Sequence, residues 1–222
     1  WRTKMEKTCI IVGAGEYGNT LDEQIEINEN DYCIAADGGL DILRQKNIVP
    51  DMILGDMDSV KSSDKIYQSD YANSKCIVLP TEKDDTDMLA AIKEGLKAGY
   101  KNFRIYGALG GRLDHTLANI QCLLYLYNRG ATGILYGPDT QLMLLGSGQS
   151  LILKDIPKRY ISVFAYGSEA SGVSIKGLKY EVSDYALKPD FPIGVSNEFI
   201  GKEGIISVKN GNIIVCFGEL LE

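Results

Sequence analysis

The stretch ILGDMDSV, residues 53–60, places two carboxylates on either side of one methionine, directly after an apolar run. The run has the character of a buried strand, and Gly55, Asp56, Met57, Asp58 and Ser59 follow at its end. Two like charges this close repel each other unless a positive group lies between them or water screens them. The stretch therefore predicts a buried strand that ends at a charged site.

Five further apolar runs resemble this one and are spread over the first two-thirds of the chain. Their apolar character is nearly continuous, which is typical of strands covered on both faces. Segments 84–98 and 112–129 lie between such runs and carry apolar residues at helical spacing. This alternation predicts an α/β N-terminal domain, residues 5–138, with a mostly parallel six-stranded sheet. The predicted strands are 8–13, 32–37, 51–56, 76–80, 103–108 and 132–137.

The pattern changes after residue 138. Short strands follow, separated by Gly, Ser, Pro and Asn, and no long helical pattern interrupts them. Asn210-Gly211 lies between IISVK and NIIVCF and predicts a hairpin, because a type I′ turn needs positive φ at both central residues. Residues 139–222 are therefore predicted to form a C-terminal all-β antiparallel domain, a sandwich or a barrel.

The composition limits the classes of partner. The 222 residues carry a net charge of −7, which disfavours binding to nucleic acid or to an anionic membrane surface. Apolar runs stay below the ~20 residues of a membrane span, and we expect no signal peptide. The five cysteines are scattered without a CxxC pair, and four of them lie in apolar runs. We expect buried, reduced thiols in a cytoplasmic protein.

Polar motifs follow four consecutive predicted strands. They are ADGG (36–39), GDMDS (55–59), TEKDDTD (81–87) and GALGGRLDHT (107–116). Ligands bind at the carboxyl ends of strands in open α/β sheets, so the motifs are expected to form one site. Helix capping is the alternative role for Asp85, Thr86 and Asp114. The pairs Gly38-Gly39 and Gly110-Gly111 are either turn residues or points where backbone N–H groups approach a phosphate.

The acidic residues suit a hard cation. Mg²⁺ binds through a few carboxylates and bridges to substrate phosphates, and Asp56, Asp58 and Asp87 are the expected ligands. Zinc is not expected, because His115 is the only histidine and the cysteines lie in core-like runs. His115 is expected to hydrogen-bond or pack beside the site rather than to catalyse. Arg112 is the expected partner of a phosphate, with a surface salt bridge as its alternative role.

Five motifs together resemble one known family. ADGG, PDMILGDMDS, TEKDDTD, GGRLDHTLAN and GVSNEF occur in the order found in thiamine pyrophosphokinases, from about residue 8 to 218. The resemblance implies transfer of a pyrophosphoryl group from ATP to the hydroxyl of thiamine, giving thiamine diphosphate and AMP. It also implies a homodimer, with ATP and Mg²⁺ on the α/β domain. Thiamine would lie in a cleft between subunits, partly built by the β domain.

The resemblance also implies roles for single residues. Asp56, Asp58 and Asp87 match metal and phosphate-site residues, and Arg112 and Asp114 match further catalytic residues; either Asp87 or Asp114 could accept the proton of the thiamine hydroxyl. The ATP-binding set is Asp37, Gly38, Gly39, Gly110, Gly111 and Arg112. The thiamine-binding set is Asp84, Ser196, Asn197 and Phe199, of which the last three come from SNEF. Lys83 departs from the pattern, because some relatives have a neutral amide there.

Other interpretations stay open at this point. SNEF also suits a β turn with one core Phe. The GAGEYG loop (13–18) resembles a dinucleotide fingerprint, in which Asp37 would bind a ribose. ILGDMDSV superficially fits the DxDxV opening of haloacid-dehalogenase-type phosphatases, although that motif usually ends the first strand and here ends the third. A pyrophosphokinase for another alcohol, such as a hydroxymethylpterin, and an inactive nucleotide-binding module are the remaining alternatives.

Overall fold

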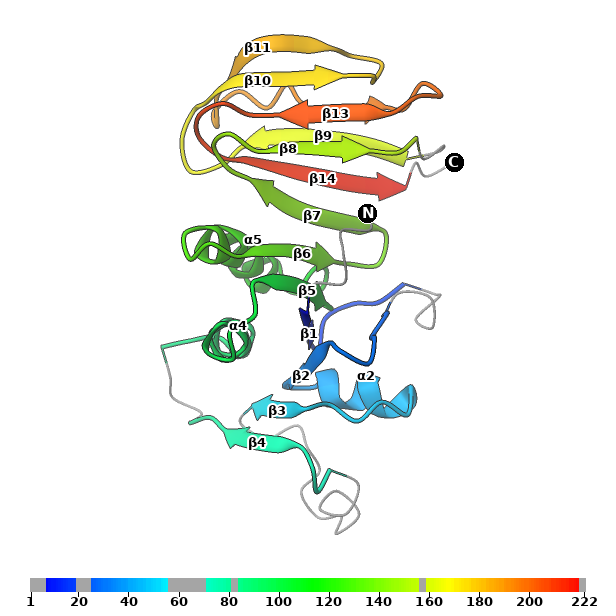
Figure 1. Cartoon of the computed structure of the whole chain (residues 1–222), viewed down its shortest axis with the longest axis vertical. Helices are drawn as coiled ribbons and strands as arrows, with labels where there is room; N and C mark the ends of the chain where they lie inside the picture. Colours follow the sequence, from blue (N-terminus) through cyan, green and yellow to red (C-terminus); the bar gives the residue numbers. More distant parts are fainter. Residues whose placement is uncertain (1–6, 19–24, 56–70, 81–83, 156–158, 220–222) are drawn as a thin grey trace. The chain divides into compact units, whose positions relative to one another are not determined.

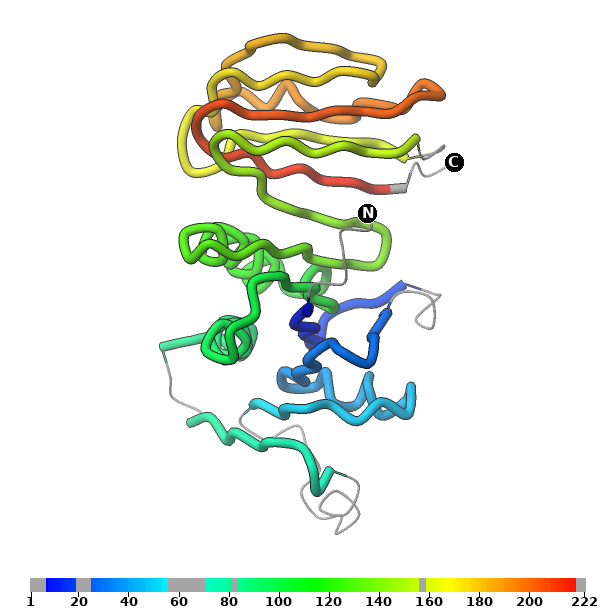
Figure 2. The backbone as a smooth tube through the Cα atoms, viewed as in Figure 1, coloured from blue at the N-terminus to red at the C-terminus, as the bar shows by residue number. Residues whose placement is uncertain are grey.

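The computed structural model describes residues 7–18, 25–55, 71–80, 84–155 and 159–219 (Figure 1). The chain divides into two compact units between Pro138 and Asp139. Figure 2 traces the backbone through both units, from the blue N-terminal strands to the red C-terminal strand. The three described helices all belong to the first unit, whereas both units contain strands. The fold is therefore mixed and sheet-rich, with few helices among the described residues.

Six strands of the first unit lie side by side and run parallel. β1 (Thr8–Val12) lies between β2 (Tyr32–Ala36) and β5 (Asn102–Tyr106). β3 (Met52–Gly55) and β4 (Lys75–Val78) continue beyond β2, and β6 (Thr132–Tyr136) pairs with β5. The order is β6-β5-β1-β2-β3-β4. Because the strands are parallel, their carboxyl ends lie at the same end of the sheet.

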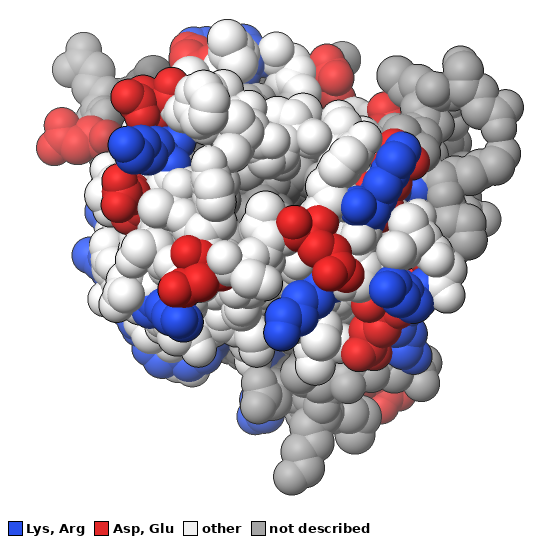
Figure 3. Space-filling model, turned by 90° about the horizontal axis from the view of Figure 1, so that it is seen from above, with Lys and Arg blue, Asp and Glu red and all other residues white. Residues whose placement is uncertain are grey.

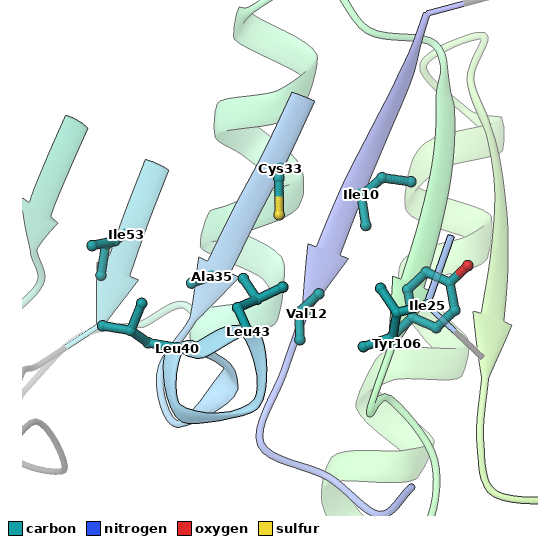
Figure 4. Close-up of a cluster of buried hydrophobic side chains, with 9 residues drawn as sticks. All are labelled: Ile10, Val12, Ile25, Cys33, Ala35, Leu40, Leu43, Ile53 and Tyr106. Carbon is teal, nitrogen blue, oxygen red and sulfur yellow. The ribbon is translucent and has the colours of Figure 1, made fainter. Parts of the chain in front are cut away.

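Helices cover both faces of this sheet. Successive side chains of a strand point to opposite faces, so Ile10 and Val12 of β1 face one way and Cys9 faces the other. Ile10 and Val12 join a buried cluster with Leu40 and Leu43 of α2 (Gly39–Gln45), as Figure 4 shows. On the other face, α4 (Asp87–Lys97) packs so closely that a methyl group on Gly95 would lie 2.8 Å from Cys9 Sγ. Burying one Leu contributes about 1.5–3 kcal/mol, so the cluster contributes strongly to the stability of this unit.

The predicted helices 84–98 and 112–129 are confirmed as α4 and α5 (Leu113–Tyr127). The helix α2 has only seven residues and was not predicted, because so short a segment shows no helical period. The prediction that strand 76–80 is covered on both faces is wrong. β4 is the edge strand of the parallel set, and Cys76 and Val78 are exposed. An apolar run does not reveal whether its strand is central or at an edge.

The second unit contains two groups of antiparallel strands. The first group has the order β12-β9-β14-β7 and the second the order β11-β10-β13-β8. The strands are β7 (Thr140–Leu145), β8 (Ser150–Leu153), β9 (Arg159–Ala165), β10 (Ala170–Lys176), β11 (Val182–Leu187), β12 (Asn197–Glu198), β13 (Gly204–Ser207) and β14 (Ile213–Glu219). In β8, Leu151 and Leu153 are buried while Ile152 is exposed, so this sheet has one covered face.

The predicted Asn210-Gly211 hairpin is wrong. β13 and β14, the strands on either side of it, belong to different sheets and pair with other neighbours. Of the two residues only Gly211 has positive φ, at 84°, so the type I′ turn is absent. Asn210 instead forms an antiparallel bridge with Ser171. At Asn210-Gly211 the chain passes from the sheet that contains β13 to the sheet that contains β14.

Two global features accompany this fold. None of the described helices is long and apolar enough to cross a membrane. On the face seen in Figure 3, acidic and basic side chains are interspersed, and the basic ones form no continuous area there.

Candidate functional site

A pocket of about 330 Å³ lies in the first unit, at the carboxyl ends of β1, β2 and β5. This volume is within the range of small-molecule sites, about 300–1,000 Å³. Three loops that follow these strands line it, together with the first turns of α4 and α5. The lining residues are Gly13, Ala14, Gly15, Glu16, Ala36, Asp37, Thr86, Asp87, Met88, Gly107, Ala108, Gly110, Gly111, Arg112, His115, Ala118 and Asn119. Residues from three of the predicted strand-end motifs therefore meet at one pocket, although not every described residue of these motifs lines it.

The loop after β1 lies directly on the loop after β5. The Gly13 N–H donates to the Tyr106 carbonyl at 2.9 Å, and the Gly15 N–H donates to the Gly107 carbonyl at 3.1 Å. A side chain on Gly15 would overlap the Gly107 carbonyl, so this close contact requires glycine. Backbone hydrogen bonds thus join the two loops that form one wall of the pocket.

Asp37 follows β2 and lines the pocket, whereas Gly38 and Gly39 do not. Asp37 has a φ of 50°, which is uncommon for a residue with a side chain, and its N–H donates to the Leu54 carbonyl at 2.8 Å. Strained residues of this kind cluster at functional sites. Gly39 is buried, and a side chain there would overlap the Val12 carbonyl, so its glycine serves the packing of α2 on β1.

The loop before α5 brings glycines and an arginine to the pocket. Gly110 has a φ of 88°, and a side chain there would lie 2.6 Å from a carboxylate oxygen of Glu16. Arg112 lines the pocket and also donates to Asp114, with an Nη2–Oδ2 distance of 2.6 Å. Asp114 itself does not line the pocket. Arg112 therefore forms the surface salt bridge considered as its alternative role, and it does so at the edge of the pocket.

Hydrogen bonding stabilises the charged forms of Arg112 and Asp114. The hydrogen bond from Arg112 lowers the pKa of the Asp114 carboxyl, and the Asp114 carboxylate raises the pKa of Arg112. Asp114 Oδ1 also accepts from the His115 N–H at 3.0 Å, in the first turn of α5. Asp114 is not the N-cap, which is Arg112, but it lies in the first turn of α5, where the helix dipole favours an acidic side chain.

The segment before α4 is held by two separate interactions. Thr86 is the N-cap, and its side chain accepts from the Leu89 N–H at 3.2 Å. Asp85 accepts two hydrogen bonds from Lys93 Nζ, at 2.7 and 2.6 Å. Asp87 follows the cap and lines the pocket, while Asp84 is exposed and does not line it. The capping alternative applies to Thr86, and Asp85 anchors the segment to α4.

Only one of the three predicted metal ligands can be placed. Asp87 lines the pocket, whereas Asp56 and Asp58 lie outside the described residues, as does Lys83. Within the described ranges, no three His, Cys, Asp or Glu side chains lie close enough together to hold a metal ion. Glu16, Asp37 and Asp87 do line the pocket, and carboxylate oxygens are metal ligands that fit Mg²⁺ rather than zinc.

The predicted thiamine residues of the second unit are joined to neighbouring segments, although only Asn197 is buried. Asn197 is buried, its Nδ2 donates to the Tyr180 carbonyl at 2.7 Å, and its Oδ1 accepts from the N–H groups of Tyr180 and Glu198, both at 2.9 Å. Ser196 has a φ of 57°, and its N–H donates to Ser162 Oγ at 3.0 Å. Phe199 forms an antiparallel bridge with Leu178. Hydrogen bonds therefore hold this segment against its neighbours, and Asn197 uses most of its hydrogen-bonding capacity for backbone groups.

Several pocket residues lie outside the predicted site. Gly13, Ala14, Gly15 and Glu16 come from GAGEYG, whose likeness to a nucleotide-binding loop was the available signal. His115 lines the pocket as well. Asn119 is buried on α5, and its Nδ2 donates to the Ala108 carbonyl at 2.7 Å. Asn119 is the last residue of the GGRLDHTLAN motif, which was the available sequence signal.

Solved structures and characterised relatives resemble the whole chain. The thiamine pyrophosphokinase of Bacillus subtilis (strain 168) is 29% identical over 212 residues, 94% of this chain and 97% of the relative. Thiamin pyrophosphokinase 1 of Caenorhabditis elegans is 28% identical over 204 residues, 87% of this chain and 81% of the relative. The crystal structure of the Bacillus subtilis thiamine pyrophosphokinase has a TM-score of 0.86 at 25% identity, covering 97% of this chain and 100% of that one.

Two family profiles match the chain in succession. Residues 24–135 match "Thiamin pyrophosphokinase, catalytic domain", which covers the larger part of the first unit. Residues 150–213 match "Thiamin pyrophosphokinase, vitamin B1 binding domain", which lies within the second unit. The two matches agree with the motif order from ADGG to GVSNEF, and the chain belongs to the thiamin pyrophosphokinase family.

Proposed function

We propose that this chain transfers a pyrophosphoryl group from ATP to the hydroxyl of thiamine, giving thiamine diphosphate and AMP. The observation that carries the proposal is the pocket at the carboxyl ends of β1, β2 and β5, most of whose lining residues belong to the segment that matches the family's catalytic domain. Pockets at this position of parallel sheets bind nucleotides. We assign ATP and Mg²⁺ to residues 5–138 and a contribution to thiamine binding to residues 139–222.

ATP binding is proposed for the loops around this pocket. The Arg112 guanidinium offers a planar set of donors to phosphate oxygens. Gly110 and Gly111 have no side chains and lie at the pocket, so backbone groups there are accessible to a ligand. Asp37 is proposed to face the nucleotide from the end of β2. Gly38 and Gly39 are proposed to contribute by allowing the tight turn into α2.

Mg²⁺ is the proposed metal, with Asp56, Asp58 and Asp87 as its ligands. A bound Mg²⁺ would neutralise phosphate charge and orient the ATP phosphates. Asp87, the one of these ligands that the structure describes, lines the pocket, and carboxylate oxygens are ligands that Mg²⁺ prefers. Asp56→Asn and Asp58→Asn are each expected to abolish AMP formation while the protein stays folded. Turnover at the wild-type rate in either variant would remove that residue from the metal site.

Catalysis is proposed to depend on positioning and electrostatics. The thiamine hydroxyl attacks the β-phosphorus in line, the bond from that phosphorus to the α-phosphate oxygen breaks, and AMP leaves. Arg112 stabilises the charge on the transferring group. Either Asp87, which lines the pocket, or Asp114, which pairs with Arg112, is proposed to accept the hydroxyl proton.

Thiamine is proposed to bind with help from Asp84, Ser196, Asn197 and Phe199, in a homodimer whose partner subunit contributes to the site. An aromatic ring can lie against the flat cationic thiazolium, and polar groups can bind the aminopyrimidine. The chain is proposed to act in the cytoplasm. The packing of Asn197 supports a shaping role for this residue, leaving Ser196 and Phe199 as the more exposed candidates for contact.

The experiment is a product assay by mass spectrometry. The protein is incubated with ATP, Mg²⁺ and either thiamine or a hydroxymethylpterin. The proposal predicts thiamine diphosphate with thiamine and no diphosphorylated pterin. A pterin diphosphate, or release of inorganic phosphate from ATP alone, would contradict it.

A further inference from the structure

The loop after β1 contains a tyrosine whose hydroxyl is used inside the protein. Tyr17 Oη donates to the Gly13 carbonyl at 2.7 Å. The ring is partly buried and packs against the cluster that contains Ile10, Val12 and Tyr106. Gly13 lines the pocket, whereas Tyr17 does not. The hydroxyl therefore contacts the pocket wall from behind.

The same hydroxyl lies against the second loop of that wall. A methyl group placed on Gly107 would be 2.5 Å from Tyr17 Oη and 2.7 Å from the Gly13 oxygen. Gly107 has a φ of 63°, and its carbonyl accepts from the Gly15 N–H at 3.1 Å. Tyr17, Gly13 and Gly107 thus meet at one point, where the loops after β1 and β5 are joined.

We propose that Tyr17 is a positioning residue, whose hydroxyl holds the Gly13–Gly15 loop against Gly107 in the conformation that binds ATP. The proposal rests on the assignment of ATP to this pocket. Without the O–H donor the Gly13 carbonyl loses its partner, and the loop gains freedom that ATP must then remove on binding. Burial raises the pKa of Tyr17 above its ordinary value of 10.0, so the hydroxyl keeps its proton throughout the neutral range.

Tyr17→Phe removes the donor and keeps the ring. Tyr136→Phe is the matched control, because Tyr136 packs against the same cluster and stacks on Tyr106 with ring centroids 4.5 Å apart, but does not line the pocket. Calorimetric titration with ATP and Mg²⁺ gives the Kd for each variant, and steady-state assays give KM and kcat. Loss of one hydrogen bond is expected to raise the Kd and the KM for ATP about fivefold in Tyr17→Phe. The kcat and the KM for thiamine should stay unchanged, and Tyr136→Phe should match wild type.

A second variant tests the shared contact point. Gly107→Ala places a methyl group against the Tyr17 hydroxyl and so disturbs the same contact. The double variant, Tyr17→Phe with Gly107→Ala, is therefore expected to raise the Kd for ATP by less than the product of the two single effects. An unchanged ATP Kd in Tyr17→Phe, or equal weakening in Tyr17→Phe and Tyr136→Phe, would overturn the proposal. Wild-type protein that binds ATP but forms no thiamine diphosphate would contradict the proposed function alone, because the titrations need no turnover. Wild-type protein that does not bind ATP would overturn both.

Discussion

The Arg112 guanidinium donates two hydrogen bonds to the Asp114 carboxylate, at 3.1 Å from Nε to Oδ1 and at 2.6 Å from Nη2 to Oδ2. Both side chains are exposed, so the pair contributes more to the orientation of Arg112 than to folding. The hydrogen bond from Arg112 holds the pKa of Asp114 below its ordinary value of 3.8. The pair is therefore formed above pH 3.8 and is lost only as the pH falls through the lowered pKa.

Arg112→Ala is expected to lower kcat/KM for ATP about tenfold, because charge-assisted hydrogen bonds to phosphate, including those to the transferring group, are lost. Arg112→Lys should recover part of this loss, since an ammonium group keeps the charge but not the planar set of donors. Arg129→Ala is the control, because Arg129 is exposed just beyond the other end of α5 and is outside the pocket lining. Steady-state kinetics of these variants between pH 6 and 9 test the prediction. The Arg112–Asp114 pair should add no pH dependence to the rate in this range, because it stays charged. Equal effects of Arg112→Ala and Arg129→Ala would contradict the assignment.

Thr86→Ala is expected to lower the free energy of unfolding by about 1 kcal/mol, because the Leu89 N–H loses its capping acceptor. Thr86→Ser keeps an oxygen at that place and should stay close to wild type. Urea denaturation measures the free energy of unfolding of both variants. The capping role fails if the alanine and serine variants are equally stable.

Asn197→Ala is expected to destabilise the protein by about 2–3 kcal/mol, since it removes hydrogen-bond partners from the backbone of Tyr180 and Glu198 in a buried place. Glu198→Gln is the control, because it weakens only the exposed pair with Lys179, whose Nζ–Oε1 distance is 2.8 Å. Chemical denaturation of both variants gives the comparison. Full stability of Asn197→Ala, with loss of thiamine binding alone, would instead favour direct contact with the substrate.

The cysteines are expected to differ in reactivity. All five are free, and Cys76 is the exposed one. Burial raises the pKa of Cys33 to about 12 and of Cys122 and Cys216 to about 11, which keeps these thiols protonated near neutral pH. A thiol reagent at pH 8 should modify one cysteine rapidly in the native protein, and Cys76→Ser should abolish this phase. Rapid modification that persists in Cys76→Ser would contradict the burial pattern.

The sequence predicted the fold where local pattern decides it. The continuous apolar runs that include Ile10 and Ile34 became central strands, and the period of 84–98 became α4. Pattern failed where tertiary context decides. β4 has a strand-like sequence but an edge position, and Asn210-Gly211 joins strands of two sheets instead of a hairpin. Neither difference is visible within a window of a few residues.

The candidate site was predicted in part. Asp37, Asp87, Gly110 and Arg112 line one pocket, as expected from strand ends that meet. Asp114 accepts hydrogen bonds from Arg112, and Asn197 donates to the backbone of Tyr180. Both side chains thus satisfy their polar groups with neighbours in the fold, which the sequence does not show. Tyr17 could not be found from sequence, since its contact with Gly13 and Gly107 exists only once two distant strands are neighbours.

The central claim, pyrophosphoryl transfer from ATP to thiamine, is tested most directly by the stoichiometry of the reaction. Wild-type protein is incubated with ATP, Mg²⁺ and thiamine, and nucleotides and thiamine esters are quantified over time by liquid chromatography and mass spectrometry. The account predicts AMP and thiamine diphosphate in equal amounts from the first time point, with no thiamine monophosphate and no ADP. Formation of ADP with thiamine monophosphate, or consumption of ATP without any thiamine ester, would contradict it.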